Sequence, residues 1–160
     1  MKQSPAEKEL TQCLGPSKFS AQGFLGHDTR PVDEIISSDQ RKLDRIGISV
    51  NTLVDSLKAI YQQARKAYGG EIQITPGVFA TFYESRGRVP SPFKTDGVFE
   101  KGEAVVREKE TGQHIIITEL GIALIERHHF FQGLGSRYRI EPEVAVRLLG
   151  LTSFEESKPP

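Results

Sequence analysis

The chain has 160 residues, enough for one domain that can fold without disulfides or a structural metal. Its 21 Lys and Arg residues balance 21 Asp and Glu residues, which argues against nonspecific coating of nucleic acid and against a polybasic membrane anchor. No apolar run is long enough to cross a bilayer, and the first residues lack the apolar core of a signal peptide. Cys13 is the single cysteine, so no disulfide can form within the chain. We therefore expect a soluble protein of the reducing cytoplasm with no membrane attachment.

Both ends of the chain differ in character from its middle. Residues 1–22 are polar and show no sustained apolar period, and residues 151–160 have the same character. Such segments are typical of chain ends that lie outside a packed domain. We expect a polar leader over residues 1–22, a single α+β domain over residues 23–150 and a polar tail over residues 151–160.

Two amphipathic helices are expected at the front of the domain. Pro31 suits the first turn of a helix whose apolar residues recur at steps of three and four until Gly47 stops it. Ser49 can cap a second helix, in which an apolar stripe continues as far as Tyr68 while the opposite face carries charged residues such as Arg65. The short link between the two helices favours an αα-hairpin.

After residue 70 the apolar period changes from helical to alternating, and β-branched and aromatic residues dominate. A loop or sheet edge that contains Pro90 and Pro92 separates two groups of strands. The expected strands cover residues 72–74, 78–83, 103–108 and 113–117. Because turns rather than helices join them, we expect a mainly antiparallel sheet.

A third helix and a short last helix complete the expected fold. Thr118 is a plausible N-cap for a helix over about residues 119–130, and Pro142 would open a short helix that ends at Gly150. We predict an α+β fold in which an N-terminal helical hairpin packs on one face of a mainly antiparallel sheet. The third helix should cover the same face, and a short C-terminal helix should follow it.

The first candidate site is a Gly-Arg loop (residues 133–139) together with an N-terminal turn (residues 23–31). The loop lacks the Gly-Lys-Ser/Thr of a P-loop and the strand-to-helix setting of a dinucleotide fingerprint. Its backbone N–H groups and the neighbouring arginines could still hold an anion. The expected ligand-binding residues are Asp28, Arg30, Gly133, Gly135, Ser136, Arg137 and Arg139. The alternative is a helix end and a tight turn, with arginines that are solvated or paired with Glu141 and Glu143.

The histidines form a second candidate site. Glu126 and His129 are three residues apart on an expected helix, a spacing that places them on one face and occurs in metal-binding bundles. The sequence has one such pair and no His-Glu-x-x-His motif, whereas a catalytic zinc usually needs three protein ligands. The candidate metal ligands are His114, Glu126, His128 and His129. The alternative is one buried, hydrogen-bonded histidine and a second histidine at the negative end of the helix.

Two smaller polar clusters also allow a functional and a structural interpretation. Residues 84–88, Glu-Ser-Arg-Gly-Arg, follow a strand, and their arginines could line a phosphate site or be ordinary exposed turn residues. Asp28 could cap a helix or pair with Arg30. No Gly-x-Ser-x-Gly motif is present, so no nucleophile stands out. The two front helices loosely resemble a helix-turn-helix, but the second has the apolar stripe of a packing helix, which argues against sequence-specific DNA binding.

Three stretches give the chain a resemblance to a group of small uncharacterised bacterial cytosolic proteins. These stretches are FLGHDTRP (24–31), TELGIALIERH (118–128) and FFQGLGSRYRIEP (130–142), and the likeness spans residues 23–149. The resemblance implies a bacterial cytosolic setting. It carries no functional residue over to this chain.

These patterns favour a non-enzymatic binding or interaction protein with a small anion-accepting pocket near the Gly-Arg loop. Its expected partner is an anionic small molecule or a protein, with no cofactor and no nucleic acid. One alternative is a metal-dependent hydrolase that uses the cluster of His128 and His129. The other is a structural subunit of a homo-oligomer.

Overall fold

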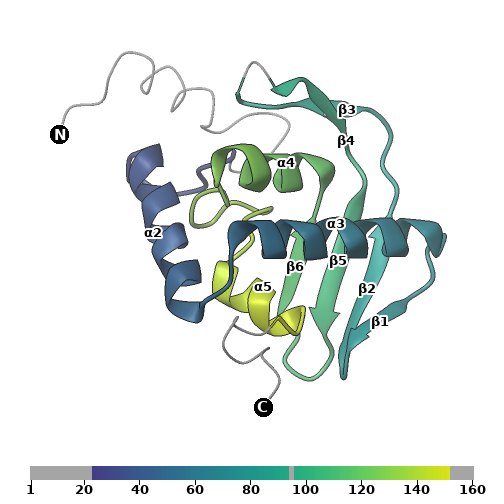
Figure 1. The fold of residues 1–160 in the computed structure, drawn as a ribbon. Helices are drawn as coiled ribbons and strands as arrows, with labels where there is room; N and C mark the ends of the chain where they lie inside the picture. The colour runs from purple at the N-terminus through teal and green to yellow at the C-terminus, as the bar shows by residue number, and fades with distance from the viewer. Residues whose placement is uncertain (1–22, 94–95, 152–160) are drawn as a thin grey trace.

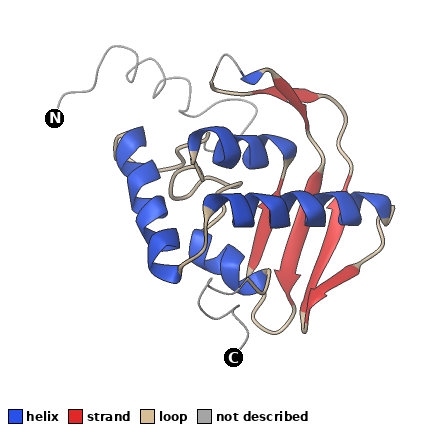
Figure 2. Ribbon diagram, viewed as in Figure 1, coloured by secondary structure: helices blue, strands red, loops and turns tan. Residues whose placement is uncertain are grey.

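The computed structural model describes residues 23–93 and 96–151 of the chain (Figure 1). Its helices and strands confirm the expected α+β class (Figure 2). The helices are α2 (Val32–Ile46), α3 (Val50–Lys66), α4 (Glu119–His128) and α5 (Pro142–Leu148). The strands are β1 (Ile72–Thr75), β2 (Val78–Tyr83), β3 (Arg88–Pro90), β4 (Val98–Glu100), β5 (Glu103–Glu108) and β6 (His114–Ile117). The proline-containing region that we expected to be a loop or a sheet edge contains β3.

The main sheet has four antiparallel strands in the order β1-β2-β5-β6. β3 and β4 form a separate two-stranded unit, the β3–β4 ribbon, which is inserted between β2 and β5. Between the last paired residues of the main sheet and the first of the ribbon, residues 84–87 lie opposite residues 101–102. Because these two connections differ in length, the ribbon can bend away from the sheet. It leans toward α4, which contacts β4 (Figure 1).

α3 lies across one face of the main sheet (Figure 1). Ser49 caps it, because the Ser49 hydroxyl accepts a hydrogen bond from the backbone N–H of Thr52 at 3.1 Å. Its apolar stripe packs against alternate residues of the strands, so that Leu57 of α3 and Val106 of β5 are both fully buried. Residues that alternate with these, such as Val105, are partly exposed. The main core of the described residues therefore lies between the sheet and its helices.

α2 packs differently from the expected hairpin. Gly47 ends α2 in the left-handed conformation, with φ of 85°, and the chain turns there so that α2 stands beside the sheet, crosswise to α3, and contacts α5 (Figure 1). Val32 and Ile35 of α2 join Leu120 and Leu124 of α4 in a second apolar cluster. Only the second helix of the expected pair covers the sheet. Apolar periodicity predicts which face of a helix is buried, but it does not predict the partner of that face.

Residues 120–125 of α4 are all buried, because they contribute to both apolar clusters. The hydroxyl of Thr118 caps it by accepting a hydrogen bond from the N–H of Gly121 at 2.9 Å. The helix ends at His128, earlier than expected, because His129 adopts the left-handed conformation with φ of 53°. Within residues 23–93 and 96–151, no helix combines the length and the apolar character that crossing a membrane requires.

Candidate functional site

The Gly-Arg loop packs closely against the N-terminal turn. The backbone N–H of His27 donates to the carbonyl of Leu134 at 3.0 Å. A Cβ atom on Gly133 would lie 2.3 Å from the carbonyl oxygen of Leu25, and one on Gly135 would lie 2.2 Å from the ring of His27. Both glycines are therefore required by the close approach of two chain segments.

Arg139 of this loop is buried and fully hydrogen-bonded, since its side chain is 6% exposed. The carboxylate of Asp39 accepts from both Nη atoms at 2.8 Å, and Glu141 accepts from Nε at 3.1 Å and from Nη2 at 2.9 Å. The carbonyl of Gln132 accepts from Nη1 at 2.6 Å, so every N–H group of the guanidinium has an acceptor. Burial alone would lower the pKa of Arg139, but the paired carboxylates outweigh burial and raise it.

Asp28 and Arg30 are paired with each other in the N-terminal turn. The Asp28 carboxylate accepts from Nε of Arg30 at 2.9 Å and from Nη2 at 2.6 Å. It also accepts from the backbone N–H of Leu134 at 3.1 Å, which ties the turn to the Gly-Arg loop. The hydrogen bonds from Arg30 hold the pKa of Asp28 well below its usual range, although burial acts in the opposite direction.

The remaining side chains of the Gly-Arg loop also have partners within the described residues. Ser136 donates from Oγ to Oε1 of Gln132 at 2.7 Å. Arg137 is 60% exposed, and its Nη2 lies 3.8 Å from a carboxylate oxygen of Glu103. The fold thus brings the predicted ligand-binding residues to one corner of the molecule. At this corner the arginines lie beside carboxylates of the same chain.

The candidate metal ligands do not form a common group within the described residues. His114 is exposed at the start of β6, and Glu126 is paired with a lysine of α3 at 2.6 Å. His128 lies 2.9 Å from Asp96, whereas His129 is exposed at the end of α4. No group of three or more His, Cys, Asp or Glu side chains in this part of the chain is placed to hold a metal ion.

His128 instead connects the tip of the β3–β4 ribbon to the end of α4. Its Nε2 lies 2.9 Å from Oδ2 of Asp96, and its ring stacks on Phe93 with 3.6 Å between the ring centroids. Ser91 donates to the same carboxylate at 3.0 Å, and Arg127 donates to the carbonyl of Asp96 at 3.1 Å. We call these contacts the ribbon latch. Burial raises the pKa of Asp96, but the bonds from His128 and Ser91 outweigh it and the pKa lies below its usual value.

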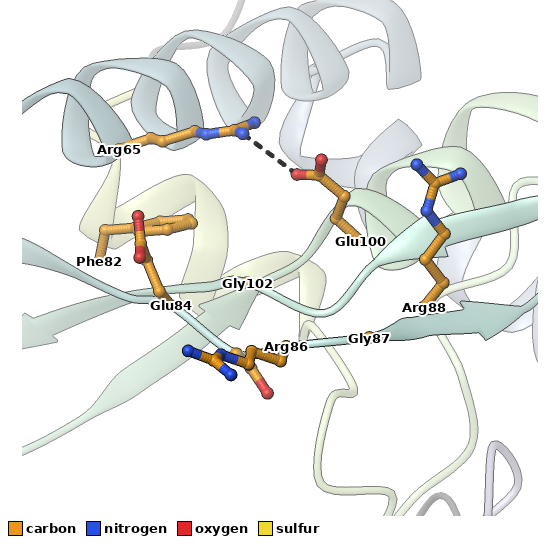
Figure 3. Close-up of a pocket in the computed structure, with 9 residues that line it drawn as sticks. Arg65, Phe82, Glu84, Arg86, Gly87, Arg88, Glu100 and Gly102 are labelled. Carbon is orange, nitrogen blue, oxygen red and sulfur yellow. Dashed lines mark ion pairs between the residues drawn. The ribbon is translucent and has the colours of Figure 1, made fainter.

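A cavity of about 470 Å³ opens where the ribbon bends away from the main sheet (Figure 3). We call it the arginine cavity. Its charged lining residues are Arg65, Glu84, Arg86, Arg88 and Glu100. Arg65 comes from the last turn of α3, whereas Arg88 and Glu100 are directly opposite each other across the β3–β4 ribbon. Segments that are far apart in the sequence therefore build this cavity.

The charges of the arginine cavity are only partly paired. Arg65 forms an ion pair with Glu100 at 3.2 Å and lies 4.0 Å from Glu119. In Figure 3 the carboxylate of Glu100 points toward Arg65, while the side chain of Arg88 lies on the other side of Glu100. Arg86 lies in the connection between β2 and β3 and projects to the opposite side of the chain from Glu84 (Figure 3). Both Arg86 and Arg88 are exposed, and neither side chain has an ion pair or a hydrogen bond among the residues that the structure describes.

An adjoining cavity of about 370 Å³ carries two exposed tyrosines, and we call it the tyrosine cavity. Tyr68 and Tyr83 line it, and it shares Arg65, Phe82 and Glu84 with the arginine cavity. Tyr68 is 93% exposed and Tyr83 is 57% exposed. The two cavities therefore adjoin at these three shared residues. Tyr83 alternates with Phe82 along β2, so its ring points to the opposite face of the strand from Phe82.

Tyr61 lies beneath this surface. Its ring meets that of Phe82 edge to face, with 5.3 Å between the centroids. Its hydroxyl is the one buried side-chain polar atom in the described part of the chain that has no hydrogen-bond partner. A Cβ atom on Gly102 would lie 2.4 Å from the Phe82 ring and 3.1 Å from this hydroxyl, so a larger residue at position 102 would not fit without movement. Burial raises the pKa of Tyr61 to about 12.

The sequence showed only part of this surface. Residues 84–88 were recognisable as two arginines near a turn, but Arg65 looked like one member of a solvated helix face. We expected Tyr68 to belong to the apolar stripe of the second helix, and this prediction was wrong. α3 ends at Lys66, and Tyr68 adopts the left-handed conformation with φ of 50°, which takes its ring out of the stripe. The glycine pair directly after Tyr68 was the available signal that the helix ends there.

The chain was also compared with protein-family models, with curated protein sequences and with solved structures, and no comparison gave a match. The case for a function therefore comes from the geometry of the arginine cavity.

Proposed function

We propose that this protein is a non-enzymatic binding protein that holds an anion in the arginine cavity. The observation that carries the proposal is a difference in how the arginines are paired. Arg30 and Arg139 near the Gly-Arg loop already bind carboxylates of the chain. Arg86 and Arg88 have no such partner among the described residues, and they line a cavity. A guanidinium in this situation can bind a carboxylate or a phosphate through two parallel hydrogen bonds.

The carboxylates of the cavity wall determine where the anion sits. Glu100 occupies Arg65 at 3.2 Å, so an anion must compete with Glu100 for this arginine. Arg88 provides a guanidinium without an internal competitor at hydrogen-bond distance. Arg86, in the connection between β2 and β3, projects to the opposite side of the chain from Glu84 (Figure 3), so it adds attraction at longer range, which salt screens. We therefore assign the main contact to Arg88 and the second contact to Arg65.

Isothermal titration calorimetry with pyrophosphate at low ionic strength tests the proposal. We expect Arg88→Ala to weaken binding about tenfold or more, because a hydrogen-bonded charged partner is lost. Arg45→Ala is the matched control, since Arg45 is exposed on α2, away from the cavity, and has no ion pair among the described residues. Equal weakening by both variants would show general charge attraction and would contradict a local site. Absence of binding to the wild-type protein would also contradict it.

Replacing Glu100 provides a second test with the opposite sign. Glu100→Gln removes the carboxylate that neutralises Arg65 and leaves a side chain of nearly the same shape. We expect pyrophosphate to bind more tightly to this variant than to the wild-type protein, because Arg65 no longer has an internal competitor. Weaker binding would contradict the placement of the anion between Arg65 and Arg88.

The two alternative functions, a metal-dependent hydrolase and a structural subunit of a homo-oligomer, stay predictions. A metal-dependent hydrolase would require ligands in addition to His128 and His129, and elemental analysis of protein purified without a metal-affinity tag would test for a bound metal. A homo-oligomer would be tested by light scattering over a range of protein concentrations.

A further inference from the structure

We infer that the face of the main sheet turned away from α3 is the interface of a homodimer, in which a second copy of the chain packs face to face on it. The two helices that pack on the main sheet, α3 and α5, lie on the same face, because the buried residues of both belong to the main core. Figure 1 shows no described helix on the other face, which we call the open face. The inference is independent of the proposed anion site, since Arg65 belongs to α3 and Arg88 belongs to the β3–β4 ribbon.

The open face is more apolar than a face that only meets water. An antiparallel sheet with one wet face usually alternates apolar residues toward the core with polar residues toward the solvent. Here the positions that alternate with the buried ones hold Phe79, Thr81 and Tyr83 of β2, Val105 of β5 and Ile116 of β6. The strand register places Thr81, Val105 and Ile116 side by side in one row. A contiguous patch of this kind indicates an interaction surface.

Two charges of β5 give the open face a self-complementary pattern. Glu103 and Arg107 point to the open face on either side of Val105, and about 13 Å of strand separates them. Arg107 is exposed, and its side chain has no ion pair or hydrogen bond among the described residues. The carboxylate of Glu103 accepts a hydrogen bond from the hydroxyl of Tyr138 and lies 3.8 Å from Arg137. A carboxylate has room for a further donor beside these two.

A two-fold axis through Val105, parallel to the sheet and perpendicular to its strands, satisfies both charges. Sheets that pack face to face lie about 10 Å apart with their strands within about 30° of each other, so β5 of the two copies runs antiparallel. Glu103 then faces Arg107 of the partner subunit, and Tyr83 faces the partner subunit's Phe79, because the register pairs Tyr83 with Glu103 and Phe79 with Arg107. An axis along the strands would instead bring like charges together.

A second copy suits the open face better than a partner of one charge sign. A purely acidic or basic surface would match one end of β5 and be repelled by the other, whereas a two-fold axis supplies the reversed pattern. Lys109 lies over the ring of Phe79 and pairs with Glu71 at 3.0 Å, so this pair adds no net charge to the face. Because the main sheet has four strands, the interface is small, and we expect the dimer to dissociate on dilution.

Sedimentation velocity of the full chain at low ionic strength, from micromolar to millimolar concentrations, tests the inference. We expect the dimer fraction of the wild-type protein to rise with concentration. Arg107→Glu places a carboxylate against Glu103 of the partner subunit at two places in the dimer, so it should weaken dimerisation at least about tenfold. Arg45→Glu is the matched control, since Arg45 is exposed on α2 and has no ion pair among the described residues.

A charge exchange tests the antiparallel arrangement. Glu103→Arg should also weaken dimerisation, because it places two guanidinium groups together. An equal mixture of Arg107→Glu and Glu103→Arg chains should form heterodimers, since position 103 of each chain then faces an opposite charge at position 107 of the other. The double variant Glu103→Arg/Arg107→Glu should dimerise by itself. Melting temperatures check that each variant folds, and if Glu103→Arg does not, the comparison of Arg107→Glu with Arg45→Glu carries the test.

Each contrary result has a definite meaning. A wild-type chain that stays monomeric at every concentration would overturn the inference. A dimer that Arg107→Glu weakens no more than Arg45→Glu does would show that the open face is not its interface. Folded single variants that form no heterodimer when mixed would overturn the two-fold axis through Val105. None of these results bears on pyrophosphate binding, which tests the anion site separately.

Discussion

The arginines of this protein have different roles because the fold places a carboxylate beside some of them, such as Arg139, and not beside others, such as Arg88. Arg139 follows glycines in the sequence and looked like part of an anion site, but its partner Asp39 lies 100 residues earlier in the chain. Arg88 stands in a short turn-like sequence, and the fold provides it with no carboxylate at pairing distance among the described residues. The sequence shows that a residue is an arginine and which residues are its neighbours in the chain. It does not show which carboxylate, if any, neutralises the charge of that arginine in the folded protein.

Arg139→Ala should strongly destabilise the protein. The ion pair between Arg139 and Asp39 is buried, with side chains 6% and 1% exposed, and the substitution leaves the Asp39 carboxylate without its main partner. Loss of one member of such a pair costs about 3–5 kcal/mol. Urea unfolding measures this loss, and Arg137→Ala, at a side chain that is 60% exposed, should cost less than about 0.5 kcal/mol. Similar stability of the two variants would contradict the structural role of Arg139.

Tyr61→Phe should leave the protein at least as stable as the wild type. The hydroxyl of Tyr61 is buried without a hydrogen-bond partner, so the folded state bears the full desolvation cost of this group. Removing it should increase the free energy of unfolding by about 1 kcal/mol. A loss of stability in urea unfolding would show that the hydroxyl has a bound partner, such as a buried water molecule.

The same variant has a predictable effect at alkaline pH. Burial raises the pKa of Tyr61 in the folded state to about 12, above its usual value of 10. The stabilisation linked to this shift is complete below pH 10 and is lost as the pH rises from 10 toward 12. Tyr61→Phe should therefore unfold less readily than the wild type in this interval. Equal alkaline unfolding of the two proteins would contradict the buried state of the phenol.

At the scale of helices and strands, the sequence predicted which elements form better than it predicted where they pack. Caps such as Ser49 and Thr118 and the alternation of residues 78–83 depend on neighbours in the chain, so these elements were visible. The place of α2 depends on the apolar surface of α4 and α5, which no local pattern describes. The short strands β3 and β4 depend on pairing with each other and on contacts with α4, so the sequence predicted only a loop or a sheet edge in this region.

The ribbon latch should hold the β3–β4 ribbon against α4. His128→Ala removes both the stacking on Phe93 and the contact with Asp96. We expect amide hydrogen exchange in β3 and β4 to accelerate roughly tenfold, with little change in α3, because the ribbon opens locally. His114→Ala is the control, since His114 is exposed on β6. Equal exchange in the two variants would show that the latch does not hold the ribbon.

Acid should break the contact between Asp96 and His128 in the ribbon latch. The pKa of Asp96 is lowered below its usual value of 3.8, so its contribution to stability is present above that value and is lost as the pH falls through the lower pKa of the folded state. As the pH falls over this range, the rate of amide hydrogen exchange in the β3–β4 ribbon, relative to that in α3, should rise in the wild type. It should change less in Asp96→Asn. Parallel pH profiles for the two proteins would contradict this account of the latch.

At the scale of the whole molecule, the arginine cavity is built from segments that are far apart in the sequence and that only the fold brings together. Arg65 at the end of α3, the connection after β2 and Glu100 of β4 meet where the ribbon leaves the sheet. The arginines of residues 84–88 were predicted as one possible phosphate site, but the approach of Arg65 and Glu100 to them depends on tertiary geometry. The bend that opens the arginine cavity follows from unequal connections between the sheet and the ribbon, which become visible once the strand register is known.

The most direct test of the account is a calorimetric titration of pyrophosphate into the wild-type protein and into the double variant Arg65→Ala/Arg88→Ala, at low ionic strength. Both side chains are exposed, so the variant should fold, and its melting temperature provides the check. We predict saturable binding to the wild-type protein and at least a tenfold weaker affinity in the variant. Unchanged affinity in a folded double variant would contradict the assignment of the arginine cavity as the binding site.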